Sequence, residues 1–99
     1  VLGGVKEKRA LYDTKLQMIN EKYEIFDEVR GEGLLIGCAL NEKYVGRARD
    51  FMVAALEHNL MILMAGPDVI RFAPSLLVTE AEIEQGMAAF EKAVAKVVA

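Results

Sequence analysis

Apolar residues recur at helical spacing near both ends of the chain. From Val5 to about Tyr23 they lie three or four residues apart, or at multiples of these spacings, on a stripe of Val5, Tyr12, Leu16, Ile19 and Tyr23. Towards the other end, Thr79 and Glu82 can each bond the other's backbone in a capping box. The stripe that follows consists of Ile83, Met87, Phe90, Val94 and Val97. Both segments are therefore predicted to be amphipathic helices.

A third helix is predicted between these two. Asn41 is suited to be its N-cap, and Asn59 is suited to the left-handed position that closes it. The expected buried stripe is Val45, Ala48, Met52, Ala55 and Leu56. The methionines are interpreted as flexible core filler, namely Met52, Met61, Met64 and Met87.

Three apolar runs have the length of β-strands. The run 34–40 does not alternate cleanly, which favours a strand covered on both faces. The runs 60–65 and 69–74 are separated by Gly66-Pro67-Asp68, and this spacing predicts a hairpin. Gly33 and Gly37 are expected to let a neighbouring group approach the first of these strands closely.

The segment 24–30 is interpreted as a link that can include a short strand through Ile25-Phe26. The expected order is therefore a helix followed by β-α-β-β-α. This order predicts an α+β fold, in which a small mixed or antiparallel sheet is covered by helices in two layers.

Composition and charge exclude several classes of protein. The chain has 99 residues, of which 54% are hydrophobic, so we expect a packed core and one domain or a piece of a larger one. The net charge of −3 gives no support for nucleic acid as a partner. No apolar run approaches the roughly 20 residues of a membrane span. A single cysteine, Cys38, cannot form an internal disulfide, and a cytoplasmic setting is expected.

Arg71 is the candidate for chemistry that the pattern favours. Alternation along the strand 69–74 places Ile70 and Phe72 on one face and Arg71 on the other. A guanidinium there can bind a carboxylate through two parallel hydrogen bonds. Two other interpretations stay open, an arginine at a solvated sheet edge and an arginine in an internal ion pair.

The other candidate residues are interpreted as structural. His58 ends the predicted middle helix, and Cys38 is a small core residue; neither has the neighbours that a metal site needs. The lysines are expected on polar helix faces or at helix ends, so none is an attractive catalytic amine: Lys6, Lys8, Lys15, Lys22, Lys43, Lys92 and Lys96.

Several ordered motifs resemble one enzyme family. Residues 29–37 read V-R-G-E-G-L-L-I-G, residues 60–66 read L-M-I-L-M-A-G, and residues 69–74 read V-I-R-F-A-P. With the capped final helix, these stretches resemble the class III, ornithine-type aminotransferases, nearest to their acetylornithine/succinylornithine branch. The resemblance covers essentially all 99 residues.

The resemblance implies a homodimeric enzyme that depends on pyridoxal 5'-phosphate. Such an enzyme transfers the terminal amino group of an N-acyl-ornithine to 2-oxoglutarate. Residues 1–24 would be a connecting helix from a large domain, and residues 25–99 the C-terminal small domain. Arg71 would hold a substrate carboxylate, whereas the catalytic lysine and the phosphate-binding residues would lie upstream. The chain opens without a methionine, so we expect a piece of a longer polypeptide that is inactive alone.

Two alternatives belong to other classes of function. A stand-alone regulatory module that binds an amino acid would also use Arg71 for a carboxylate. A structural cap or interaction domain would need no site at all.

Overall fold

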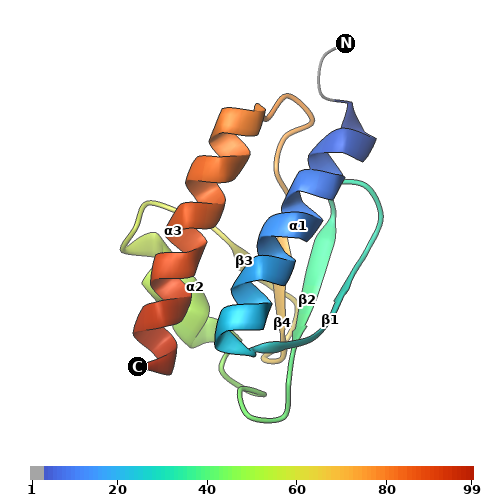
Figure 1. The fold of residues 1–99 in the computed structure, drawn as a ribbon. Coiled ribbons are helices and arrows are strands. Elements are labelled where there is room, and N and C mark those ends of the chain that lie inside the picture. The colour runs from blue at the N-terminus through green and yellow to red at the C-terminus, as the bar shows by residue number, and fades with distance from the viewer. Residues whose placement is uncertain (1–3) are drawn as a thin grey trace.

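The computed structural model describes residues 4–99, which form three helices and four strands in an α+β arrangement. Their order along the chain is α-β-β-α-β-β-α, and the fold agrees with the predicted class (Figure 1). The elements are α1 (Val5–Tyr23), β1 (Phe26–Arg30), β2 (Ile36–Leu40), α2 (Ala48–Leu56), β3 (Leu63–Met64), β4 (Val69–Phe72) and α3 (Glu80–Val98). The first three residues of the predicted 1–24 segment lie outside the described residues.

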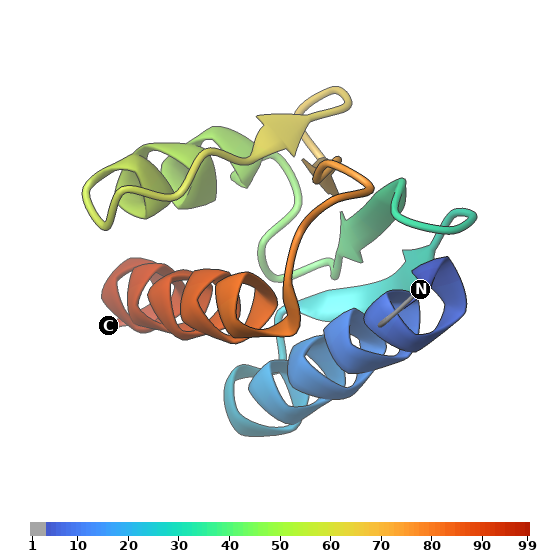
Figure 2. The same cartoon turned by 90° about the horizontal axis from the view of Figure 1, so that it is seen from above.

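The four strands form one sheet in the order β1-β2-β4-β3, and every described pair is antiparallel. Helices α1 and α3 run side by side over one face, whereas α2 packs against α3 near β3 and β4 (Figures 1 and 2). The opposite face carries no helix in the described part of the chain. This two-layer arrangement leaves one face of the sheet for other contacts.

The bounds and the buried residues of the two terminal helices are largely those that the pattern predicts. α1 has the predicted bounds, and the capping box of α3 is present. In this box the Thr79 side chain accepts a hydrogen bond from the Glu82 amide, and the Glu82 carboxylate accepts one from the Thr79 amide. The α3 stripe is buried apart from Val97, which is half-buried. Two predictions for α1 are wrong: the Lys8 side chain is buried, and Val5 at the helix start is exposed.

The predicted start of the middle helix is wrong. Asn41 makes a local turn instead, in which its side-chain oxygen accepts a hydrogen bond from the Lys43 amide. Gly46 then adopts a positive φ of 85°, which a continuing helix cannot accommodate. α2 starts only at Ala48, and its buried residues are Ala48, Phe51, Ala54 and Ala55.

The predicted stripe of this helix is wrong in part for the same reason. Val45 precedes the helix and is exposed, as is Leu56 on its outer side, and Met52 is half-buried. Phe51, which the pattern left out, is fully buried and packs edge to face against Tyr44. The left-handed conformation of Asn59 is confirmed, with a φ of 62°.

The strands also differ from the predicted runs. β1 covers five residues instead of a short stretch at Ile25-Phe26, and β3 covers only two residues of the run 60–65. β2 alternates between buried and half-buried positions and is not fully covered on both faces. Met87 is buried as predicted, but Met61 and Met64 are exposed because the short β3 lies at an edge of the sheet.

Aromatic rings join the sheet to the helices that cover it. The Phe90 ring of α3 packs edge to face on Phe72 of β4, with ring centroids 5.1 Å apart, and stacks on Phe26 of β1 at 6.2 Å. The Tyr12 ring of α1 lies 6.3 Å from that of Phe72. Phe72 is therefore held from two helices, and it is the residue next to Arg71.

Candidate functional site

Arg71 lies on the outer face of β4, as alternation along the strand predicts. Ile70 and Phe72 are buried against the helices, whereas the Arg71 side chain is exposed on the face without a helix. Within residues 4–99 the guanidinium has no carboxylate partner, so the internal ion pair finds no support there. The planar fork of donors is thus available to an anion.

Arg71 belongs to a row of residues that crosses the whole sheet. Arg30 of β1 is opposite Gly37 of β2, Gly37 is opposite Arg71 of β4, and Arg71 is opposite Leu63 of β3. Two guanidinium groups therefore flank a position that has no side chain. Around this row lies an open groove of about 570 Å³, lined by Arg30, Gly31, Glu32, Leu35, Gly37, Ala65, Val69 and Arg71.

The two arginines of the groove differ in their partners. Arg30 pairs with Glu28 on its own strand at 3.1 Å, and both side chains are more than half exposed. Such a surface pair contributes little to stability, about 0–1 kcal/mol. Arg71 has no such partner among the described residues. Of the two, Arg71 is the better placed to receive a carboxylate from solution.

Of the two glycines predicted to allow close approach, Gly33 does so and Gly37 does not. A Cβ on Gly37 would lie 3.6 Å from Val69 Cγ1 and 3.8 Å from Arg30 Cγ, which is ordinary contact, so close approach does not require glycine there. A Cβ on Gly33 would meet Val5 Cγ1 at 3.3 Å, as the prediction of close approach expects. Gly31 is more constrained still, because a Cβ there would lie 2.1 Å from the Leu35 carbonyl oxygen.

Arg9 of α1 holds the turn that carries these glycines. Its Nη1 donates to the carbonyl oxygens of Gly31 at 3.0 Å and Gly33 at 2.9 Å, while its Nε bonds Asp13 at 2.8 Å. Sequence reasoning missed Arg9, because nothing in a helical pattern indicates which distant carbonyls a side chain reaches. The arginine positions the rim of the groove from the other face of the sheet.

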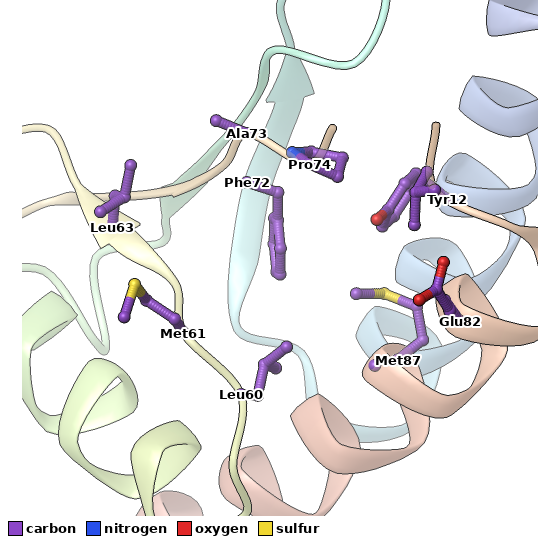
Figure 3. A pocket seen from close by; sticks show the side chains of 11 residues that line it. Tyr12, Leu60, Met61, Leu63, Phe72, Ala73, Pro74, Glu82 and Met87 are labelled. Atoms are coloured by element: carbon purple, nitrogen blue, oxygen red, sulfur yellow. The ribbon is translucent and has the colours of Figure 1, made fainter. Parts of the chain in front are cut away.

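A second cavity lies on the helix side of β4, between α1, α3 and the residues before β3 (Figure 3). Its volume is about 280 Å³, and most of its wall is apolar. Tyr12 and Glu82 are among its few polar groups; burial, with a smaller effect of the Glu82 charge, raises the pKa of Tyr12. Tyr12 and Pro74 both line this cavity (Figure 3).

The lysines of the described residues lie away from the Arg71 groove. No lysine lines the Arg71 groove. Lys8 is the only buried lysine in residues 4–99, and its Nζ donates to the Leu76 carbonyl oxygen at 2.8 Å. Arg71 and its groove fit a carboxylate group.

The remaining sequence candidates are structural or peripheral. Cys38 is fully buried, and burial raises the pKa of its thiol to about 12. His58 follows the end of α2 and is half-buried. Among the described residues, no group of three or more His, Cys, Asp or Glu side chains could hold a metal ion. No helix in the same residues has both the length and the apolarity to cross a membrane.

An α+β domain with an arginine on the open face of its sheet can be compared with known proteins. The family model described as aminotransferase class-III matches residues 1–94. The chain therefore belongs to the class III aminotransferase family, whose members depend on pyridoxal phosphate.

Individual relatives agree with this assignment. The chain is 57% identical over 99 residues to the acetylornithine aminotransferase of Shewanella oneidensis, covering 100% of the chain and 24% of that protein. It is 53% identical over 98 residues to the succinylornithine transaminase/acetylornithine aminotransferase of Pseudomonas aeruginosa, covering 99% of the chain and 24% of the relative.

A solved structure extends the agreement to the fold. The crystal structure of N-acetylornithine aminotransferase from Stenotrophomonas maltophilia superposes with a TM-score of 0.93 at 35% identity, covering 95% of the chain and 26% of that protein. The chain thus spans about a quarter of the length of the relatives that it matches.

Proposed function

We propose that the chain is the substrate-carboxylate domain of an acetylornithine/succinylornithine aminotransferase that depends on pyridoxal phosphate. The enzyme transfers the terminal amino group of an N-acyl-ornithine to 2-oxoglutarate in the cytoplasm, as a homodimer. Residues 1–24 connect to the large domain, and residues 25–99 are the C-terminal small domain. The family membership and the names of the relatives support this proposal.

Arg71 carries the part of the function that belongs to this chain. Both the amino donor and 2-oxoglutarate present carboxylates, and one bidentate fork can serve both halves of the reaction. The observation behind this role is the exposed guanidinium, without a carboxylate partner in residues 4–99, in a groove on the open sheet face. The cofactor supplies the bond making, and Arg71 orients the substrate towards it.

The division of labour also explains the lysines of this chain. The groove of Arg71 has no lysine in its lining, and the catalytic lysine and phosphate-binding residues are assigned to the large domain. The 99-residue chain is accordingly expected to be inactive alone. The regulatory-module alternative has no specific observation in its favour, whereas the family model matches residues 1–94.

The test is Arg71→Lys in the full-length enzyme, with Arg30→Lys as the matched control on the same sheet face. A charge-assisted hydrogen bond contributes about 1.5–3 kcal/mol, so loss of the bidentate geometry should lower kcat/KM for 2-oxoglutarate by at least about tenfold. Arg30→Lys keeps the charge beside Glu28 and should change kcat/KM by less than about threefold. An Arg71→Lys enzyme with unaltered kcat/KM would remove Arg71 from the site.

A further inference from the structure

Lys8 is a buried cation that contacts a distant loop. The side chain lies on α1, and the residue is only 8% exposed. Its Nζ donates to the carbonyl oxygen of Leu76, 68 positions further along the chain, at 2.8 Å. Removing an ammonium from water is costly unless hydrogen bonds compensate for it. The hydrogen bond to the Leu76 carbonyl therefore compensates for the burial of Lys8, which a lysine exposed to solvent would not need.

The same face of α1 makes a second contact with the segment that contains Leu76. Tyr12 lies one helical turn after Lys8, and residues four apart share a helix face. Its ring lies 6.3 Å from that of Phe72, at the end of β4 (Figure 3). Lys8 and Tyr12 therefore hold residues 72–76 at both ends, with Pro74 between them.

The other hydrogen bonds of this loop are local, and Val78 at its end packs against the core. The Ser75 carbonyl accepts from the Val78 amide, and its hydroxyl accepts from the Leu77 amide, which closes a turn within the loop itself. The side chains of Leu76 and Leu77 are 66% and 86% exposed and so provide little packing. Among the described side-chain hydrogen bonds, the one from Lys8 is what ties this turn to a helix.

We propose that Lys8 is a positioning residue for Arg71. By bonding the Leu76 carbonyl, Lys8 holds the segment that follows β4 in place. Together with Tyr12, it fixes the position of Phe72, the last residue of the strand. Arg71 precedes Phe72 directly, so the direction of its guanidinium on the open face depends on that strand end. The inference rests on the proposed carboxylate role of Arg71 and adds a residue that acts through it from the other face of the sheet.

The test uses Lys8→Met in the full-length enzyme, with Lys6→Met as the matched control, because Lys6 is an exposed lysine on the same helix. A misaligned Arg71 weakens binding of the substrate equally in the ground state and in the transition state. KM for 2-oxoglutarate should therefore rise about fivefold or more, while kcat stays within about twofold. Lys6→Met should change neither quantity. Lys8→Arg keeps a long cationic donor, so its rise in log KM should be at most half of that in Lys8→Met.

A double-mutant cycle separates positioning from a general loss of structure. In the Arg71→Lys background, Lys8→Met should raise KM by less than about twofold, because residues that act through one another are not additive. A merely structural role would lower the melting temperature or the active fraction and leave KM unaltered. If Lys8→Met is not recovered folded, Lys8→Leu takes its place, since it also removes the donor.

The outcomes distinguish this inference from the function on which it rests. An unchanged KM in folded Lys8→Met or Lys8→Leu, together with a lowered kcat/KM in Arg71→Lys, overturns the positioning role only. Fully additive effects of Lys8 and Arg71 would overturn the positioning role in the same way. An Arg71→Lys enzyme with normal kinetics overturns the proposed function itself.

Discussion

Arg71 on β4 lies directly opposite Gly37 on β2, so the guanidinium has a neighbour without a side chain. On the far side of Gly37, the same row continues to Arg30 of β1. The pairing leaves room beside Arg71 on the face that no described helix covers. The groove depends on the absence of a side chain at Gly37, and not on a backbone conformation that only glycine can adopt.

Filling this space should weaken substrate binding with little loss of stability. A Cβ at position 37 makes only ordinary contacts, so Gly37→Ala should leave both KM and the melting temperature of the full-length enzyme nearly unaltered. Gly37→Leu extends into the groove between the two arginines and should raise KM for 2-oxoglutarate about tenfold. The measurement is steady-state kinetics of both variants; equal KM values for alanine and leucine would show that substrate does not enter the groove.

The turn before β2 should be far less tolerant than the turn before β4. Gly31 has a φ of 108°, and a Cβ there would lie 2.1 Å from the Leu35 carbonyl oxygen. Gly66 has a φ of 74° but open space around it. Gly66→Ala should therefore cost only the left-handed strain of about 1–2 kcal/mol, and Gly31→Ala clearly more. Urea unfolding of the 99-residue chain measures both, and a Gly31→Ala cost no greater than that of Gly66→Ala would contradict the geometry.

The capping box should contribute measurably to α3. Thr79→Ala removes the side-chain oxygen that accepts from the Glu82 amide, and loss of such a cap costs about 1 kcal/mol. Thr14→Ala is the control, because Thr14 is an exposed residue inside α1, where alanine is slightly the better helix former. Thermal unfolding should separate the two variants by several degrees. If both melt at the same temperature, the cap contributes nothing in solution.

Cys38 should be unreactive in the folded chain. Burial raises the pKa of its thiol to about 12, and the thiol is fully buried, so almost no thiolate is accessible near neutral pH. A disulfide reagent at pH 8 should modify it only as fast as the chain opens. Complete modification within seconds under native conditions would contradict this burial. Addition of urea above the unfolding midpoint supplies the positive control.

The same thiol makes stability depend on alkaline pH. The pKa of Cys38 is about 12 in the folded chain against an ordinary value of 9.0, so above pH 9 the unfolded chain loses this proton first. The contribution to the free energy of unfolding is therefore complete below pH 9 and is lost as the pH rises towards 12. Tyr12, whose pKa is also raised, acts in the same direction above its ordinary value. Cys38→Ala should flatten the decline between pH 9 and 11, and an identical slope in both proteins would rule out this linkage.

Local rules were enough for the elements that depend on their own residues. The bounds of α1 and the start of α3 follow from helical spacing and from a capping box only four residues long. The outward direction of Arg71 follows from alternation between Ile70 and Phe72. The same rules placed the start of α2 too early. The Asn41 side chain can accept a backbone hydrogen bond either as an N-cap or in a local turn, and in the structure it makes the turn.

Local sequence patterns were sufficient to predict the α+β class, both long helices, and an arginine on the outer face of a strand. Three features became visible only in the folded chain: Gly37 lies beside this arginine, Lys8 is buried, and Arg9 holds the turn at Gly31. The physical reason is the range of the interactions. Periodicity and caps act over a few neighbouring residues, whereas strand pairing, the burial of a cation and bonds to distant carbonyls depend on groups that meet only when the chain folds.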